Sequence, residues 1–334
     1  MRVSRRAFLE AGSLGLLGLA RDFGALAGMR AARGARPRSP ERALVCLFLR
    51  GGADGLSVVV PHGDPVYYRE RPRIAVPRRA VIDLDGYFGL HPALAPLKPL
   101  WDARALAAVH AAGWPQPIAG HAEAQRALES GILWAARGAP QRAGPGRHPA
   151  PDAAPAASAA VAYPPGEAGR ALRRIARLLE TDPGLAIACA AITGWDTHLD
   201  QGGAAGPLAA RLAELARALA AFARDLGPRF ADVVVLVLSE FGRSVPENAH
   251  GGTDHGHATA LLVLGGAVEG GRVLGRWPGL DPARRSAPHG LAATTDVRDV
   301  VAEILTRHLG ARDAAAAFPG FPADPRRFPG VVRT

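Results

Sequence analysis

Three short, uninterrupted apolar runs constrain the fold of this 334-residue chain more than any other feature. They occupy residues 44–49, 185–192 and 233–238. Continuous apolar runs of this length, bounded by polar residues, are typical of strands buried on both faces of a parallel sheet. Between the second and third runs, residues 207–222 have the apolar spacing of an amphipathic helix. This alternation predicts an α/β class fold, an α/β/α sandwich around a mostly parallel, doubly wound sheet.

Further elements extend this pattern along the chain. Residues 105–110 and 258–264 are candidate strands, and residues 122–133 and 296–309 are predicted helices. The stretch 136–166 differs, since it is rich in Ala, Pro, Gly and Arg and has no apolar period. We interpret it as a surface loop or a disordered insert.

The N-terminus has the features of an export signal. Residues 1–27 combine a charged start, an apolar segment and a small-residue cleavage pattern, which indicates a signal peptide rather than a membrane-spanning helix. Residues 4–9 read SRRAFL, which closely resembles the twin-arginine motif. The twin-arginine translocase is therefore a predicted partner, and the predicted location is periplasmic or extracellular. Residues 28–41 are predicted to be a flexible tether, and residues 42–325 a single domain without a transmembrane segment.

Charge argues against a nucleic-acid partner. The chain carries a net charge of +10, but residues 1–38 hold eight arginines against two acidic residues and so account for +6 of it. The remaining +4 is spread over the rest of the chain. Nucleic-acid binding requires a concentrated basic patch or stripe, and the sequence has none.

The two cysteines, Cys46 and Cys189, both lie inside apolar runs. A free cysteine packs as a small hydrophobic residue, and neither residue has the spacing of a metal ligand. The sequence leaves a disulfide between them open, because pairing cannot be deduced from sequence alone.

Carboxylates and imidazoles follow the apolar runs. Those after the three runs are, in order, Asp54, Asp196 with His198, and Glu240. In an open parallel sheet, ligands bind in the crevice beyond the carboxyl ends of the strands. Asp196 and His198 are two residues apart, so in an extended segment they face the same way and can share an ion. Asp54 taken alone is better explained as a cap of its own turn, and Glu240 as the polar end of a strand.

The densest group of possible ligands lies at residues 251–257, which read GGTDHGH. Histidine is the commonest protein metal ligand, so we expect His255, His257 or both to bind a metal. Asp254 is a candidate for orienting a ligating ring. With the strand-end carboxylates these residues predict a divalent metal site, for which Zn, Mn, Mg and Ca all remain possible.

Two residues are candidates for holding an anion. His121 lies at the start of a predicted helix, where free N–H groups favour an anion, although the sequence alone favours a solvent-facing histidine near a helix cap. Arg243 could pair with Glu240 or hold an anionic substrate in a bidentate clamp.

Several motifs resemble domain of unknown function 1501, in order from residue 43 to residue 322. They are LRGGADGL at 49–56, GWDTH at 194–198, SEFGR at 239–243, GTDHGH at 252–257, RWPGL at 276–280, TTD at 294–296 and FPG at 318–320. That family is similar in its strand-end pattern to the alkaline phosphatase and sulfatase superfamily. The resemblance implies an alkaline-phosphatase-like α/β/α sandwich with one or two divalent metals. The ligands it implies are Asp54, Asp196, His198, Glu240 and one or both of His255 and His257.

The resemblance fails at the nucleophile. Relatives typically carry Ser-His where this chain has Gly120-His121, so a covalent enzyme intermediate cannot form at residue 120. Two hypotheses remain. One is a hydrolase of phosphate or sulfate esters that uses metal-activated water. The other is a non-catalytic exported binding or interaction protein, a pseudoenzyme on the same scaffold.

Overall fold

The computed structural model describes residues 42–117, 120–125, 161–182, 184–286, 288–311, 314–318 and 320–334. The predicted export signal, the tether and most of the predicted insert at residues 136–166 lie outside the described residues. Within the described ranges, every helix is too short or too polar to cross a membrane.

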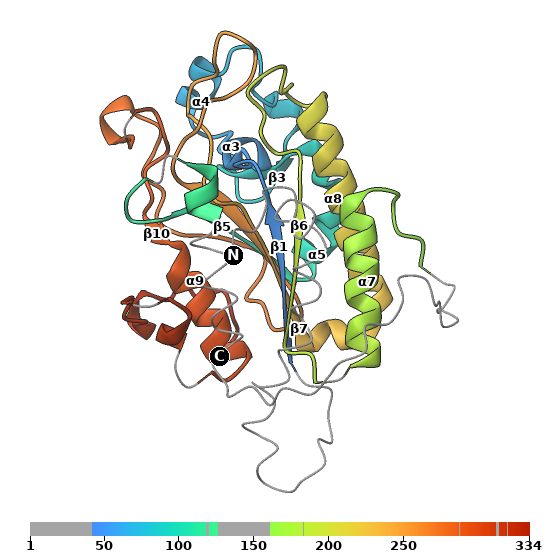
Figure 1. Cartoon of the computed structure of the whole chain (residues 1–334). Helices are drawn as coiled ribbons and strands as arrows, with labels where there is room; N and C mark the ends of the chain where they lie inside the picture. The colour runs from blue at the N-terminus through green and yellow to red at the C-terminus, as the bar shows by residue number, and fades with distance from the viewer. Residues whose placement is uncertain are drawn as a thin grey trace, which may run out of the picture.

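A seven-stranded sheet forms the centre of the fold (Figure 1). The strand order is β10 (Thr295–Asp296), β5 (Leu106–Gly113), β8 (Thr259–Leu264), β7 (Val233–Leu238), β1 (Ala43–Leu49) and β6 (Ile187–Ile192), and β9 (Arg272–Leu274) also pairs with β5. Strand β1 pairs in parallel with β6 and β7, and β5 pairs in parallel with β9 and β10. The α/β fold with a mostly parallel sheet is confirmed. The sheet is mixed, however, because β8 runs antiparallel to both of its neighbours.

The three apolar runs form the adjacent strands β7, β1 and β6, as expected for sequences that a sheet covered on both faces can bury. Every residue of β1 and β7 is buried. Strand β6 ends the sheet order and is slightly more exposed, at Cys189 and Ala191.

Helices cover the two faces of the sheet. Helices α7 (Glu167–Thr181) and α8 (Pro207–Leu226) run side by side on one face, and α9 (Val297–Glu303) lies on the other (Figure 1). Helix α8 starts at a proline, which is favoured in a first helical turn, and its apolar stripe is buried. Residues 304–308 continue α9 as a single π-helical turn.

The remaining helices, strands and turns are short. The helices are α3 (Gly55–Val58), α4 (Pro65–Glu70) and α5 (Lys98–Asp102); the strands β2 (Val59–Val60), β3 (Ile82–Asp83) and β4 (Gly89–Leu90) form a second small sheet; and the 3-10 turns are η1 (Arg78–Ala80), η2 (Pro92–Leu97), η3 (Gly227–Asp232), η4 (Pro282–Arg284), η6 (Ala314–Ala317) and η7 (Pro325–Arg327). Residues 121–125 are also helical.

The direction of β8 decides where its neighbouring motif lies. Because β8 is antiparallel to β7, the amino end of β8 lies at the same edge of the sheet as the carboxyl end of β7. The pairing continues beyond both strands, with the Gly242 N–H donating to His257 O at 2.8 Å and the Gly256 N–H donating to Gly242 O at 2.8 Å. The segment around Glu240 therefore lies against the segment around His255.

Candidate metal centre

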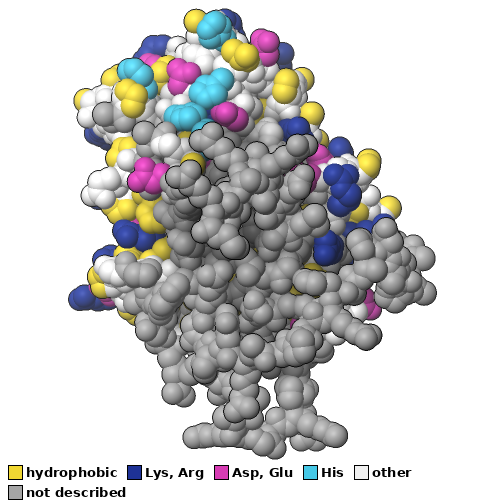
Figure 2. Space-filling view, in the orientation of Figure 1, with side chains coloured by type: hydrophobic (Ala, Val, Ile, Leu, Met, Phe, Trp, Pro, Cys, Tyr) yellow, Lys and Arg dark blue, Asp and Glu magenta, His cyan; other side chains and the backbone are white. Residues whose placement is uncertain are grey.

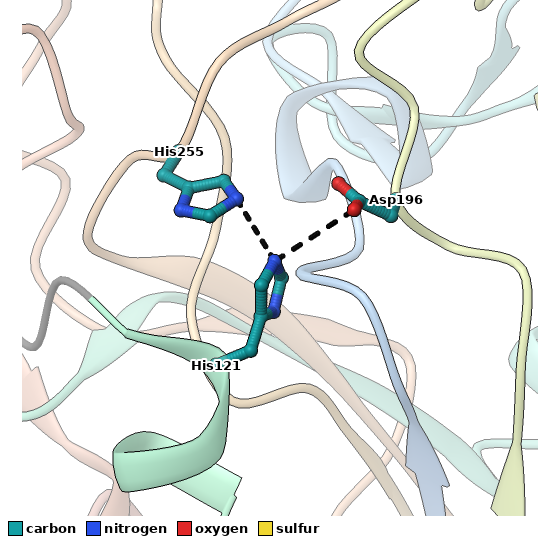
Figure 3. Close-up of side chains that lie close together, drawn as sticks. All are labelled: His121, Asp196 and His255. Carbon is teal, nitrogen blue, oxygen red and sulfur yellow. Dashed lines mark hydrogen bonds and ion pairs between the residues drawn. The ribbon is translucent and has the colours of Figure 1, made fainter.

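Three side chains from distant parts of the chain meet at this edge. His121 follows β5, Asp196 follows β6, and His255 precedes β8. One nitrogen or oxygen atom of each lies within 4.8 Å of one such atom of the other two. Figure 3 shows the His121 ring between the other two side chains. Figure 2 shows imidazole and carboxylate side chains beside one another in the upper part of this face.

The spacing and chemistry of the cluster fit a metal ion. His121 Nε2 lies 2.8 Å from His255 Nε2 and 3.9 Å from Asp196 Oδ2. These distances bracket the roughly 3.4 Å that separates ligand atoms around a four-coordinate zinc ion. The His121 side chain is 27% exposed and that of Asp196 is 50% exposed, so one side of the cluster is open to solvent. An open position is what distinguishes catalytic zinc sites from closed structural ones.

Glu240 orients His121 from behind. Glu240 Oε1 lies 2.7 Å from His121 Nδ1 and also accepts from the Gly51 N–H and the Gln125 side chain, each at 2.9 Å. Its other oxygen accepts from Ser239 Oγ at 2.9 Å, and its side chain is fully buried. Burial raises the pKa of Glu240, but the hydrogen bonds from Gln125, from the backbone and from His121 outweigh it and hold the pKa low. Glu240 therefore lies behind the His121 ring rather than in the exposed group.

A second carboxylate–imidazole pair flanks the cluster. His198 Nε2 lies 3.1 Å from Asp196 Oδ1, as expected for two side chains on one side of an extended segment. His198 Nδ1 lies 3.4 Å from Asp254 Oδ1, which also accepts from Asn248 at 3.0 Å. The hydrogen bond from Asn248, against a smaller effect of burial, keeps the pKa of Asp254 low. Asp254 thus contacts His198, and His198 borders the three grouped residues.

Arg243 holds the turns that carry the site. Its guanidinium is fully buried and donates to the carbonyl oxygens of Gly51, Gly52 and Thr253 and to the Asp196 carboxylate. Burial would raise the pKa of Asp196, but the hydrogen bond and charge of Arg243 outweigh it and lower the pKa. The structure places Arg243 neither against Glu240 nor as an open anion clamp, because its donors serve the protein itself.

Asp54 lies apart from this group, in a buried ion pair. Arg71 Nη1 donates to Asp54 Oδ2 at 2.6 Å and Nη2 donates to Oδ1 at 3.0 Å, and both side chains are fully buried. Ser57 Oγ and Gln201 Nε2 each donate to Oδ2 at 2.7 Å. Burial raises the pKa of Asp54, but the charge and hydrogen bonds of Arg71 outweigh it. Protein donors therefore hydrogen-bond to both carboxylate oxygens of Asp54, whereas the resemblance implies that Asp54 binds a metal.

His257 is also turned away from the cluster. Its Nδ1 lies 2.7 Å from Ser286 Oγ and its Nε2 lies 2.6 Å from the Trp114 carbonyl oxygen. Burial lowers the pKa of His257, which keeps the ring neutral. Of the two histidines in the 251–257 motif, the structure therefore brings only His255 to Asp196 and His121.

Sequence reasoning missed Gln201, which links the turns that carry Asp196 and His255 to the buried ion pair. Its Oε1 accepts from Thr197 Oγ1 at 2.7 Å and from Thr253 Oγ1 at 2.9 Å, while its Nε2 donates to Asp54. Thr197 lies between Asp196 and His198 and faces inward while they face the site. Sequence reasoning also missed Gln125, Asn248 and Arg71, since an amide or a distant arginine gives no motif signal.

Comparison with known proteins places the chain in a family. The sequence model of a family described as a protein of unknown function, DUF1501, matches residues 147–320, which is just over half of the chain. The chain belongs to this family. No curated protein matches it. The matched range of this DUF1501 protein includes Asp196, Arg243 and His255, while His121 lies before it.

Proposed function

We propose that this DUF1501 protein is an exported, divalent-metal-dependent hydrolase of phosphate or sulfate esters. The observation that carries the proposal is the His121, Asp196 and His255 cluster, which is open to solvent and has a buried carboxylate behind it. The ester class comes from the resemblance to alkaline phosphatases and sulfatases.

Glu240 and Arg243 determine where the protons lie on His121 and Asp196. Because the Glu240 carboxylate only accepts hydrogen bonds, the Nδ1 of His121 carries the proton and its Nε2 presents a lone pair to the cluster. Arg243 holds Asp196 in its ionised form. A divalent ion bound there would act as a Lewis acid and bring the pKa of a bound water near neutrality.

The donor set favours particular metals. Two imidazoles and one carboxylate suit Zn or Mn, whereas Mg and Ca prefer oxygen ligands throughout. We therefore propose Zn or Mn as the resident ion.

Elemental analysis of the purified protein tests the site. We expect about one equivalent of metal in the wild type, and its loss in His121→Ala and Asp196→Ala. His257→Ala and His250→Ala are matched controls, the first next to the site and turned away, the second exposed in the preceding turn, and both should retain the metal. Retention of full metal content by His121→Ala and Asp196→Ala would overturn the assignment.

Turnover of aryl phosphates and aryl sulfates tests the reaction. We expect hydrolysis that stops on chelation, returns on addition of Zn or Mn, and is absent from Asp196→Ala. If the protein binds stoichiometric metal but hydrolyses neither ester, the non-catalytic binding protein is the correct alternative.

Export by the twin-arginine route is a separate part of the proposal. It rests on the sequence of residues 4–9, which lie outside the described part of the chain. Replacing Arg5 and Arg6 by Lys should retain the protein in the cytoplasmic fraction. Unchanged export of this variant would exclude the route.

A further inference from the structure

Cys46 and Cys189 are direct partners in the sheet. Strands β1 and β6 pair in parallel, and their register places Cys46 opposite Cys189. Adjacent strands lie about 4.8 Å apart, and most disulfides join Cα atoms separated by about 4.4 to 6.8 Å. Side chains at registered positions of paired strands point to the same face. The neighbouring Cys189 and burial raise the pKa of the Cys46 thiol, which agrees with two thiols lying close together.

The two thiols differ in access. Cys46 is buried in the middle of the sheet, with β7 on its other side, while Cys189 is half-buried on the strand that ends the sheet order. An external oxidant therefore reaches Cys189 first.

From this register and access, we infer that Cys46 and Cys189 form an intramolecular disulfide when the protein enters an oxidising environment. A disulfide of the glutathione type is the oxidant. The Cys189 thiolate attacks it and releases one reduced thiol, and the Cys46 thiolate then attacks the Cys189 sulfur and releases the second. Two protons leave the protein thiols, and the two electrons reduce the oxidant.

The disulfide would link the edge strand β6 covalently to the central strand β1, below the candidate metal centre. Strand β1 leads to Gly51, whose N–H donates to Glu240, and β6 leads to Asp196. Within the described sheet β6 pairs with β1 alone, so its far side lacks a hydrogen-bonded neighbour. A cross-link between residues so far apart in sequence also restricts the unfolded chain strongly.

The chain has two cysteines in all, so one mass measurement identifies the bond. Full-length protein is reduced, freed of reductant, equilibrated with oxidised glutathione, denatured and alkylated. We expect a monomer that has lost two hydrogen atoms and takes up no alkyl group, and two alkyl groups after reduction. Two alkyl groups on the oxidised sample, a stable glutathione adduct or a disulfide-linked dimer would each overturn the inference.

Two further measurements test whether the disulfide stabilises strand β6 against β1. Oxidation should slow amide exchange in residues 187–192 and raise the melting temperature by about 5 °C, reversibly with reductant. The Cys46→Ala/Cys189→Ala variant is the matched control, and neither quantity should respond to oxidant in it. A disulfide that forms without slowing amide exchange in β6 would contradict this stabilisation of the strand. The second attack should quicken as pH rises, because the neighbouring Cys189 and burial raise the pKa of Cys46.

Discussion

Single residues at this site take their roles from their hydrogen-bond partners rather than from their type. Asp54, Asp196 and Glu240 are three carboxylates that follow three strands of the same sheet. Asp54 is neutralised by a buried arginine, Glu240 orients a histidine, and only Asp196 faces solvent. The same chemical group thus serves stability, orientation or ligand binding, depending on which donors surround it.

The ion pair of Asp54 and Arg71 gives a prediction about stability. Arg71→Met should lower the free energy of unfolding by roughly 3 to 5 kcal/mol, because it leaves a buried carboxylate without its counter-charge. The double variant Asp54→Leu/Arg71→Met should be less destabilised than Arg71→Met. Denaturant unfolding measures both. The double variant should also retain bound metal. If the folded double variant contained no metal, Asp54 would be a metal ligand after all.

The orienting role of Glu240 gives a prediction about affinity. Glu240→Gln keeps the size of the side chain but removes the charge behind His121. We expect metal affinity to fall roughly 10- to 100-fold, as for other residues that orient a ligating histidine. Competition with a chromophoric chelator measures it. The matched control is Glu247→Gln, since Glu247 pairs with Arg73 instead; equal losses in the two variants would contradict the role.

At the scale of elements, the turns after the strands hold the site together. Gly51, two residues after the end of β1, has a φ of 126°, and an added Cβ would lie 2.4 Å from the Asp196 backbone nitrogen. The first turn therefore packs against the turn that carries Asp196, and glycine is what permits this approach.

A pair of glycine variants tests this packing. Gly51→Ala should cost about 3 kcal/mol of stability through backbone strain and the close contact, and it should weaken metal binding. Gly120→Ala is the matched control, because a Cβ there meets no described atom within 4 Å and its φ lies outside the left-handed region. Thermal melts and metal titration measure both variants. A Gly51→Ala protein as stable as the control would show that the turns are not tightly packed.

At the scale of the molecule, buried histidines make stability depend on pH. His110 lies within β5, and burial lowers its pKa from an ordinary value of 6.5 to about 4. Its ring lies 2.9 Å from the carbonyl oxygen of Val59, which opposes the shift without cancelling it. His91 and His308 are shifted in the same direction, mainly by burial.

The sign of this dependence follows from the lowered pKa. Between pH 6.5 and about 4 the unfolded chain binds a proton at residue 110 that the folded chain does not, so stability falls as pH falls through this window. The contribution of His110 is roughly 3 kcal/mol across the window. Denaturant unfolding at several pH values measures it. His110→Gln should flatten the curve between pH 6 and 4, and an unchanged slope would contradict the assignment.

The sequence by itself determined the local elements and the chemistry that they carry. Apolar runs such as residues 233–238 favour a buried strand, and the spacing in α8 favours a helix with one buried face. The same reasoning placed candidate ligands at strand ends, and Asp196 and His255 do lie together there. These conclusions depend on neighbouring residues only, which is why sequence was sufficient.

Only the tertiary structure decided which candidates meet. The antiparallel course of β8 brings His255 to the edge where the parallel strands end, and a fully parallel sheet would place it at the opposite edge. Arg71 pairs with Asp54 across 17 residues of sequence, and Glu240 holds His121, which the sequence offers only as a possible anion-site residue, at the centre of the cluster. Long-range pairings of this kind depend on strand order and direction, which a local pattern does not encode.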